Sequence, residues 1–269
     1  MNVPYSNFFL SNEVEDQLSS KLDLERFCKV DRGLEGAPGM IRKINRYSAT
    51  DGTEKLEMGE GNTATITAGY VQKDYEILLA QNRFAYYDEE AMTDPLMVVT
   101  GVRHGAVDLY NTFQADIIGE FAQAELEVES QFPDFAAFVD AVALLNMEAP
   151  EDEEIFAFVC PADVAKVRKA LKDDLKYVEA FSRNGYIGSV GGVNLYTTKL
   201  ATEGEICGGT REAVTLFLKS GTEVEQSNIY NRSADDANIR KNVVYTRKYY
   251  FAALTNATKA FKITLTSGT

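Results

Sequence analysis

The sequence predicts an α+β protein, and three of its segments support that fold class. Apolar residues recur at helical spacing over residues 94–129, which indicates one long helix. A continuous apolar run at 155–160 is followed by a helical pattern that begins with Pro161, which is typical of a strand-to-helix unit. The tyrosine-rich ending, residues 237–254, indicates a strand that closes the fold.

Length and charge narrow the class of protein. With 269 residues, 45% of them hydrophobic, the chain can bury a substantial core, as two lobes or as one large domain with an extension. Its formal net charge of -14 opposes tight binding to nucleic acid, because no basic block compensates for it. No stretch approaches the roughly 20 apolar residues of a membrane span, and the N-terminus has no basic leader.

The N-terminal third predicts a projecting arm. After a short amphipathic helix at residues 12–21, the segment 31–39 contains too many glycines and prolines for a regular element. Residues 40–47 and 75–87 are predicted strands, and the polar stretch 48–69 between them has nothing to fill a core. Such a long loop indicates an extended hairpin tip with a functional role, and an ordinary surface hairpin is the alternative.

The middle of the chain predicts helices and then a glycine-rich loop. If unbroken, the helix over 94–129 would be about 45 to 50 Å long, but Gly101 and Gly105 favour a bend. A second helix is predicted over 133–145. The glycines of residues 185–192 predict a turn-rich loop that leads into a strand at 193–198. The segment 211–219 fits either period, and 261–265 is a final strand.

Catalytic and metal-binding patterns are weak throughout the sequence. The one histidine, His104, falls on the predicted long helix, where a surface position explains it better than a catalytic triad does. Cys28, Cys160 and Cys207 lack the spacing of a disulfide framework or a zinc site and suit a reducing cytoplasm. The acidic runs at 88–90 and 148–154 lack the ligand spacing of a calcium loop. We therefore predict no catalytic residue, no metal and no cofactor.

The order of these parts resembles the major capsid protein of tailed bacteriophages, which has the Hong Kong 97-type fold. The sharpest local matches are residues 158–171, 184–198 and 236–253. The resemblance implies an N-terminal arm at 1–38, an E-loop hairpin at 39–88 and a peripheral domain with a spine helix at 89–131. It further implies an axial domain at 132–225 and a return to the peripheral domain at 226–269.

The same resemblance implies the residues that contact neighbours. The candidates for assembly contacts are Arg42, Lys43, Arg46, Lys55, Asp88, Glu89 and Glu90. The candidates for the loop near the capsomer axis are Gly185, Gly188, Gly191 and Gly192.

The implied function is that of a structural head protein, not an enzyme. It would form hexamers and pentamers, use a separate scaffolding protein and a portal, and enclose double-stranded DNA without binding it tightly, as an acidic interior favours. It would be made in the bacterial host cytoplasm, reside in the virion capsid and have no membrane partner. Alternatives are an encapsulin-like shell that holds an enzyme cargo and, less favoured, a small cytoplasmic α/β enzyme whose site lies at the end of the strand 155–160. A secreted adhesin is disfavoured by the missing signal peptide.

Overall fold

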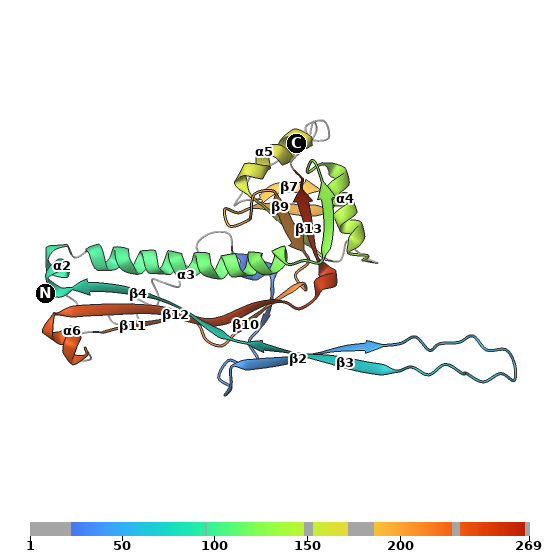
Figure 1. The fold of residues 1–269 in the computed structure, drawn as a ribbon, viewed down its shortest axis with the longest axis horizontal. Coiled ribbons are helices and arrows are strands. Elements are labelled where there is room, and N and C mark those ends of the chain that lie inside the picture. Colours follow the sequence, from blue (N-terminus) through green and yellow to red (C-terminus); the bar gives the residue numbers. More distant parts are fainter. Residues whose placement is uncertain (1–22, 95, 148–152, 172–185, 228–231, 267–269) are drawn as a thin grey trace.

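The computed structural model describes residues 23–94, 96–147, 153–171, 186–227 and 232–266. Within these ranges lie two β-sheets, a long helix that packs on both, and a two-stranded hairpin that extends far from the rest (Figure 1). The predicted α+β class is confirmed. The helix predicted at residues 12–21 lies outside the described residues.

The first sheet is built around β12 (Lys241–Leu254), the long tyrosine-rich strand. β4 (Leu78–Tyr87) pairs antiparallel along one edge of it, while β10 (Val214–Leu218) and β11 (Glu223–Gln226) pair with successive parts of the other edge. β1 (Lys29–Asp31) continues the sheet in parallel to β10. The short helices α2 (Asp88–Thr93) and α6 (Ala234–Asn238) lie at the far end of this sheet (Figure 1).

The second sheet forms a separate lobe with the strand order β5-β13-β9-β6-β8-β7. Every residue of its strand β6 is buried, as the continuous apolar run predicts. The helices α4 (Phe135–Leu144) and α5 (Pro161–Ala170) contribute to the same apolar cluster of this lobe. The strands are β5 (Leu126–Ser130), β6 (Ile155–Val159), β7 (Tyr186–Val190), β8 (Val193–Thr197), β9 (Glu205–Gly209) and β13 (Ala260–Leu265).

The long helix α3 (Leu96–Ala122) packs on both sheets. Its first half buries Val102 and Ala106 in an apolar cluster with Val244 of β12. Its second half buries Phe121, whose ring centroid lies 5.5 Å from that of Phe156 in the second sheet. The ring of Phe27, from the short 3-10 helix η1 (Leu24–Phe27), joins this aromatic group. A second 3-10 helix, η4 (Ala257–Lys259), links β12 to β13.

Two predictions about the long helix are wrong. The helix ends at Ala122, and residues 126–130 form β5 instead, because their alternating burial suits parallel pairing with β13. The helix is also continuous through Gly101 and Gly105. These glycines allow close packing: a Cβ on Gly101 would lie 2.3 Å from the Phe84 ring, and the Asn82 side chain donates a hydrogen bond of 2.5 Å to the Gly105 carbonyl oxygen.

The strand predicted at 75–87 divides at Ile77. Its first residues belong to β3 (Ala68–Glu76), which pairs with β2 (Ile41–Ala49), whereas β4 leaves the hairpin and pairs with β12. Ile77 is buried at the division, and its backbone N–H donates to the Met40 carbonyl oxygen at 2.8 Å. The stretch between β2 and β3 has no helix or strand, as predicted for the hairpin tip.

The glycine-rich segment is a β-hairpin, so the prediction of a loop there is wrong. β7 and β8 pair antiparallel across a turn at Gly191 and Gly192, both of which have positive φ angles. A register shift between Tyr186 and Gly188 marks a β-bulge, and the φ of 139° at Gly188 suits glycine. Gly185 lies outside the described residues.

Strand pairing crosses the predicted domain boundaries. The segment 39–88 contains both the hairpin and β4, which belongs to the first sheet. The segment 89–131 includes β5 of the second sheet. The segment 132–225 supplies β10 and β11 to the first sheet, and 226–269 supplies β13 to the second. The two lobes are therefore joined by several crossings of the chain.

We predict that Gly208→Ala strongly destabilises the second lobe. A Cβ at Gly208 would lie 2.1 Å from the Phe156 carbonyl oxygen, in the backbone of a central strand that has no room to move. Overpacking of this kind typically costs on the order of 3 kcal/mol. Urea unfolding measures the loss.

The matched control is Gly119→Ala on the exposed side of α3, where nothing lies within 4 Å of the new methyl group. It should leave stability unchanged or raise it by up to about 1 kcal/mol, because alanine favours a helix. Equal unfolding midpoints for the two variants would contradict the packing assigned to Gly208.

Candidate assembly surface

The hairpin of β2 and β3 is the largest feature that the protein's own core does not support. Its nine residue pairs run from Ile41 opposite Glu76 to Ala49 opposite Ala68. It forms a sheet of its own and extends away from both lobes (Figure 1). A two-stranded ribbon is marginally stable by itself in water. Its outer part therefore presents unpaired strand edges that a neighbouring chain can cover.

Large apolar side chains along this hairpin are exposed. Residues 68–74 of β3 are all exposed, and only the base of the hairpin reaches a core, where Tyr75 is buried and Ile44 packs against the same apolar cluster. An elongated group of exposed apolar residues on one projection is typical of an interaction surface. Its members are Ile41, Leu56, Met58, Ile66, Tyr70 and Val71.

Polar contacts across the tip hold its two sides together. Thr63 donates hydrogen bonds from its backbone N–H and its hydroxyl to the Glu54 carboxylate, each at 3.0 Å. Asn62 donates to the Gly52 carbonyl oxygen at 3.1 Å, and the Thr67 N–H donates to the Thr50 hydroxyl at 3.0 Å. The hydrogen bonds from the backbone and then the hydroxyl of Thr63 lower the pKa of Glu54.

The basic candidates from the sequence lie on this hairpin. Arg42 pairs with Asp31 at 3.0 Å, and Lys43 pairs with Asp74 at 3.4 Å, so both are engaged within the chain. Lys55 is exposed at the tip. Arg46 belongs to β2, but its side chain lies outside the described part of the structure. β2 carries three basic residues and no acidic one, but Asp31 and Asp74 compensate the charges of Arg42 and Lys43.

Two cavities lie where the hairpin meets the body. A cavity of about 790 Å³ is lined by Val71 and Tyr75 from the hairpin and by Glu120 at the end of α3. A second cavity of about 510 Å³ continues along α3 beside Leu78 and Leu79, whose side chains are 57% and 46% exposed. The base of the hairpin is therefore hollowed and partly apolar.

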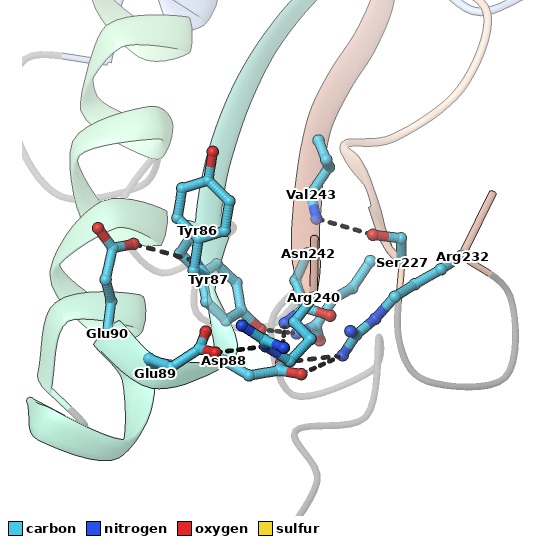
Figure 2. A network of polar contacts seen from close by, with 11 residues as sticks. Tyr86, Tyr87, Asp88, Glu89, Glu90, Ser227, Arg232, Arg240, Asn242 and Val243 are labelled. Carbon is cyan, nitrogen blue, oxygen red and sulfur yellow. Dashed lines mark hydrogen bonds and ion pairs between the residues drawn. The ribbon is translucent and has the colours of Figure 1, made fainter. Parts of the chain in front are cut away.

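The acidic candidates form a network at the opposite end of the first sheet (Figure 2). The Arg232 guanidinium donates to both carboxylate oxygens of Asp88 at 2.9 Å, and Asn242 donates to Asp88 at 2.6 Å. Glu89 pairs with Arg240, and Glu90 accepts a hydrogen bond of 2.9 Å from the Tyr87 backbone N–H.

This network fixes α2 to the start of β12. The Arg232 side chain is only 7% exposed, so its charge depends on Asp88 for compensation. Arg240, with a positive φ of 54°, also accepts a hydrogen bond from the Asp88 backbone N–H at its carbonyl oxygen. Asp88, Glu89 and Glu90 therefore have partners inside the chain, and the sequence gives no sign of those of Asp88 and Glu89 because Arg232 and Arg240 are distant in sequence.

The groups that nucleophilic or metal chemistry needs are not assembled within the described residues. Burial raises the pKa of the Cys28 and Cys207 thiols to about 12, which opposes a reactive thiolate. His104 is exposed on α3, as predicted. No group of three or more potential metal ligands is found in the described part of the chain. None of its helices combines the length and the apolarity of a membrane-spanning segment.

Known structures share this arrangement over nearly the whole chain. The capsid protein of the cyanophage P-SCSP1u superposes with a TM-score of 0.66 at 10% identity, covering 90% of this chain and 87% of that one. The SrpI encapsulin of Synechococcus elongatus PCC 7942 also gives 0.66, at 12% identity, covering 91% and 89%. This protein has the Hong Kong 97-type capsid fold. The capsid fold thus accommodates the projecting hairpin, the long helix and the second lobe in one chain.

The sequence comparison also finds a capsid protein. The chain is 25% identical over 272 aligned residues to the major capsid protein of Staphylococcus phage phiMR11, covering 96% of this chain and 93% of the relative. No family model matches the sequence. Capsid proteins therefore match this chain both in sequence and in fold.

We predict that Asp88→Ala costs about 3 kcal/mol of stability, because it leaves the charge of Arg232 buried without its partner. Glu89→Ala is the matched control. It removes an exposed ion pair on the same helix and should cost less than about 1 kcal/mol. Chemical denaturation of unassembled protein compares the two, and similar losses would contradict a structural role for Asp88.

We predict that Glu54 titrates below the ordinary range of a glutamate. Because its folded pKa is lowered, its bonds to Thr63 favour the closed tip above the ordinary glutamate pKa. That contribution is lost as pH falls through the lowered pKa. Carboxyl NMR measures the titration, and Thr63→Val should move the pKa part of the way back by removing the hydroxyl donor. An ordinary titration in the parent protein would refute the contact.

Proposed function

We propose that this protein is the major capsid protein of a tailed phage or prophage, which assembles into an icosahedral shell around double-stranded DNA. The similarity to the phiMR11 major capsid protein supports this function because it covers nearly all of both chains. Within the structure, the hairpin is the strongest support for this function. It exposes apolar side chains on a ribbon that gains stability when neighbouring copies cover it.

The parts of the chain then take the following roles. The hairpin of β2 and β3 is the E-loop, and α3 is the spine helix of a peripheral domain built on the first sheet. The second sheet with α4 and α5 is the axial domain, and the turn at Gly191 and Gly192 faces the capsomer axis. Arg42, Lys43, Arg46 and Lys55 contact neighbours from the E-loop. Asp88, Glu89 and Glu90 act indirectly by holding the end of the first sheet in shape.

The proposed assembly implies several partners for this protein. Copies of the chain form hexamers and pentamers, with a separate scaffolding protein and a portal. The DNA is enclosed without tight binding, since a net charge of -14 repels a polyanion. The protein is made in the host cytoplasm and ends in the virion capsid. Its role is structural and involves no catalysis.

An encapsulin-like shell is the second candidate, because the SrpI encapsulin matches as well as the cyanophage capsid does. The content of the particle distinguishes the two functions. Shells purified from the native host should contain double-stranded DNA if the protein is a phage capsid, and a folded enzyme if it is an encapsulin. A protein that stays monomeric at all concentrations under electron microscopy and light scattering would exclude both.

We predict that removing the hairpin tip leaves a folded protein that cannot complete shells. Ala49 and Ala68 are paired across the two strands, so Asn-Gly in place of residues 50–67 closes the shortened ribbon with a two-residue turn. Thermal melting should stay within a few degrees of the parent protein, because the tip does not contribute to a core.

Particle formation by the deletion variant is followed by electron microscopy. The matched control keeps the tip length and replaces Asp51, an exposed tip residue outside the candidate contacts, with alanine, which should still allow assembly. Closed particles of normal size from the deletion variant would contradict the E-loop assignment.

A further inference from the structure

The outward side of α4 is apolar. Ala137, Phe138 and Ala141 are buried in the second lobe, but Phe135 and Val139 on the other side remain 51% and 39% exposed. Asp140 is the only charged residue of this helix. A helix that is hydrophobic all round is normally buried on all sides. The exposed side of α4 therefore requires a cover that this chain does not supply among its described residues.

The outward side of α5 is basic. Lys166, Arg168 and Lys169 are exposed, together with the small side chains of Ala162 and Ala165. The single acidic residue of this helix, Asp163, is fully buried. It accepts hydrogen bonds from Lys166 at 2.6 Å and from the Gly204 backbone N–H at 2.7 Å, and Lys166 also pairs with Glu203 at 3.5 Å. The positive charge of this side therefore comes mainly from Arg168 and Lys169.

The two helices complement each other in charge and shape. α4 offers bulky apolar side chains with one carboxylate, and α5 offers alanines and lysine stems with an excess of positive charge. Long lysine stems readily cover apolar surface while their ammonium groups stay at the rim. Within the described residues, the ion pairs of α5 involve Lys166, and none involves Lys169 or Asp140 of α4.

We propose that α4 of one copy packs against α5 of the next copy around the capsomer. Figure 1 shows α4 and α5 on different sides of the second lobe, as a head-to-tail contact requires. Such a contact uses two different surfaces of each copy and closes into a ring when the rotation fits. This inference rests on the proposed capsid function and names a surface through which the ring closes.

A second copy fits this surface better than an unrelated protein does. Each copy carries a net charge of -14, so most of its surface repels identical copies. A contact that places the one carboxylate of α4 beside the lysines of α5 replaces that repulsion with attraction. A separate acidic partner would be drawn to α5 but would leave the apolar side of α4 uncovered.

A charge exchange tests the contact. Asp140→Lys and Lys169→Glu each place like charges across the proposed interface and should raise the protein concentration needed for assembly about tenfold or more. The double variant Asp140→Lys/Lys169→Glu restores opposite charges and should recover assembly close to that of the parent protein. The control is Asp108→Lys on the exposed side of α3, which makes the same charge change away from both helices. Light scattering against concentration and electron microscopy measure assembly, and thermal melting verifies folding.

A second variant tests the apolar part independently of charge. Phe135→Ser should weaken assembly while changing the melting temperature little, because half of that side chain is already exposed.

The outcomes separate this contact from the proposed function. Assembly of the parent protein, loss in both single variants and recovery in the double variant support the contact. Normal assembly of the single variants, or loss without recovery in the double variant, overturns it and leaves the capsid function standing. Single variants that assemble normally alone but fail when phage proteins are co-expressed would assign α4 to a different protein and also overturn it. Failure of the parent protein to assemble counts against the proposed function itself.

Discussion

Simultaneous packing of one helix on two sheets is the constraint on which this structure depends. α3 buries Val102 and Ala106 against the first sheet and Phe121 against the second. The two sheets also exchange strands along the chain, because β10 follows β9 and β13 follows β12. The lobes are therefore held in a fixed relation by buried aromatic contacts. A rigid body of this kind can present the hairpin and the second lobe to neighbours at defined angles.

The hairpin and the two lobes, which form the body of the protein, are stabilised by different interactions. In the body, apolar side chains are buried in the protein's own clusters, and the exposed fraction of residues such as Phe121 and Phe156 is close to zero. In the hairpin, side chains of the same type, such as Val71, stay exposed, and cross-strand hydrogen bonds and polar contacts maintain the shape. In the proposed shell, contacts between copies supply the free energy that the hairpin lacks by itself. This division explains why a protein with a well-packed core still carries a long polar loop.

Elements whose signal is local were predictable from the sequence. The run of buried residues in β6, the proline at the start of α5 and the alternation in β13 each fix their element without help from distant residues. The hairpin tip was also predictable, because its polar residues exclude a core. The resemblance to phage capsid proteins rested on the order of these elements, and the fold agrees with it.

Features decided by distant partners were not predictable. Nothing near Ile77 shows that the chain leaves the hairpin there, since β4 is defined by pairing with β12. Gly101 suggested a bend, but its role is to admit the Phe84 ring. Asp88 was a candidate for an assembly contact, whereas its partner Arg232 lies in the same chain, 144 residues further along. A single sequence does not show which distant residues pair, so these side-chain partners could not be predicted from it.

Because the outer part of the hairpin does not contact the core, the chain can fold before copies assemble. A newly made chain can close both lobes before it meets another copy, because no buried cluster waits for the outer ribbon. Folding is then a first-order event, whereas growth of a particle depends on how many finished subunits collide. In the proposed shell, folded subunits can therefore accumulate until their concentration is high enough for copies to cover one another's hairpins.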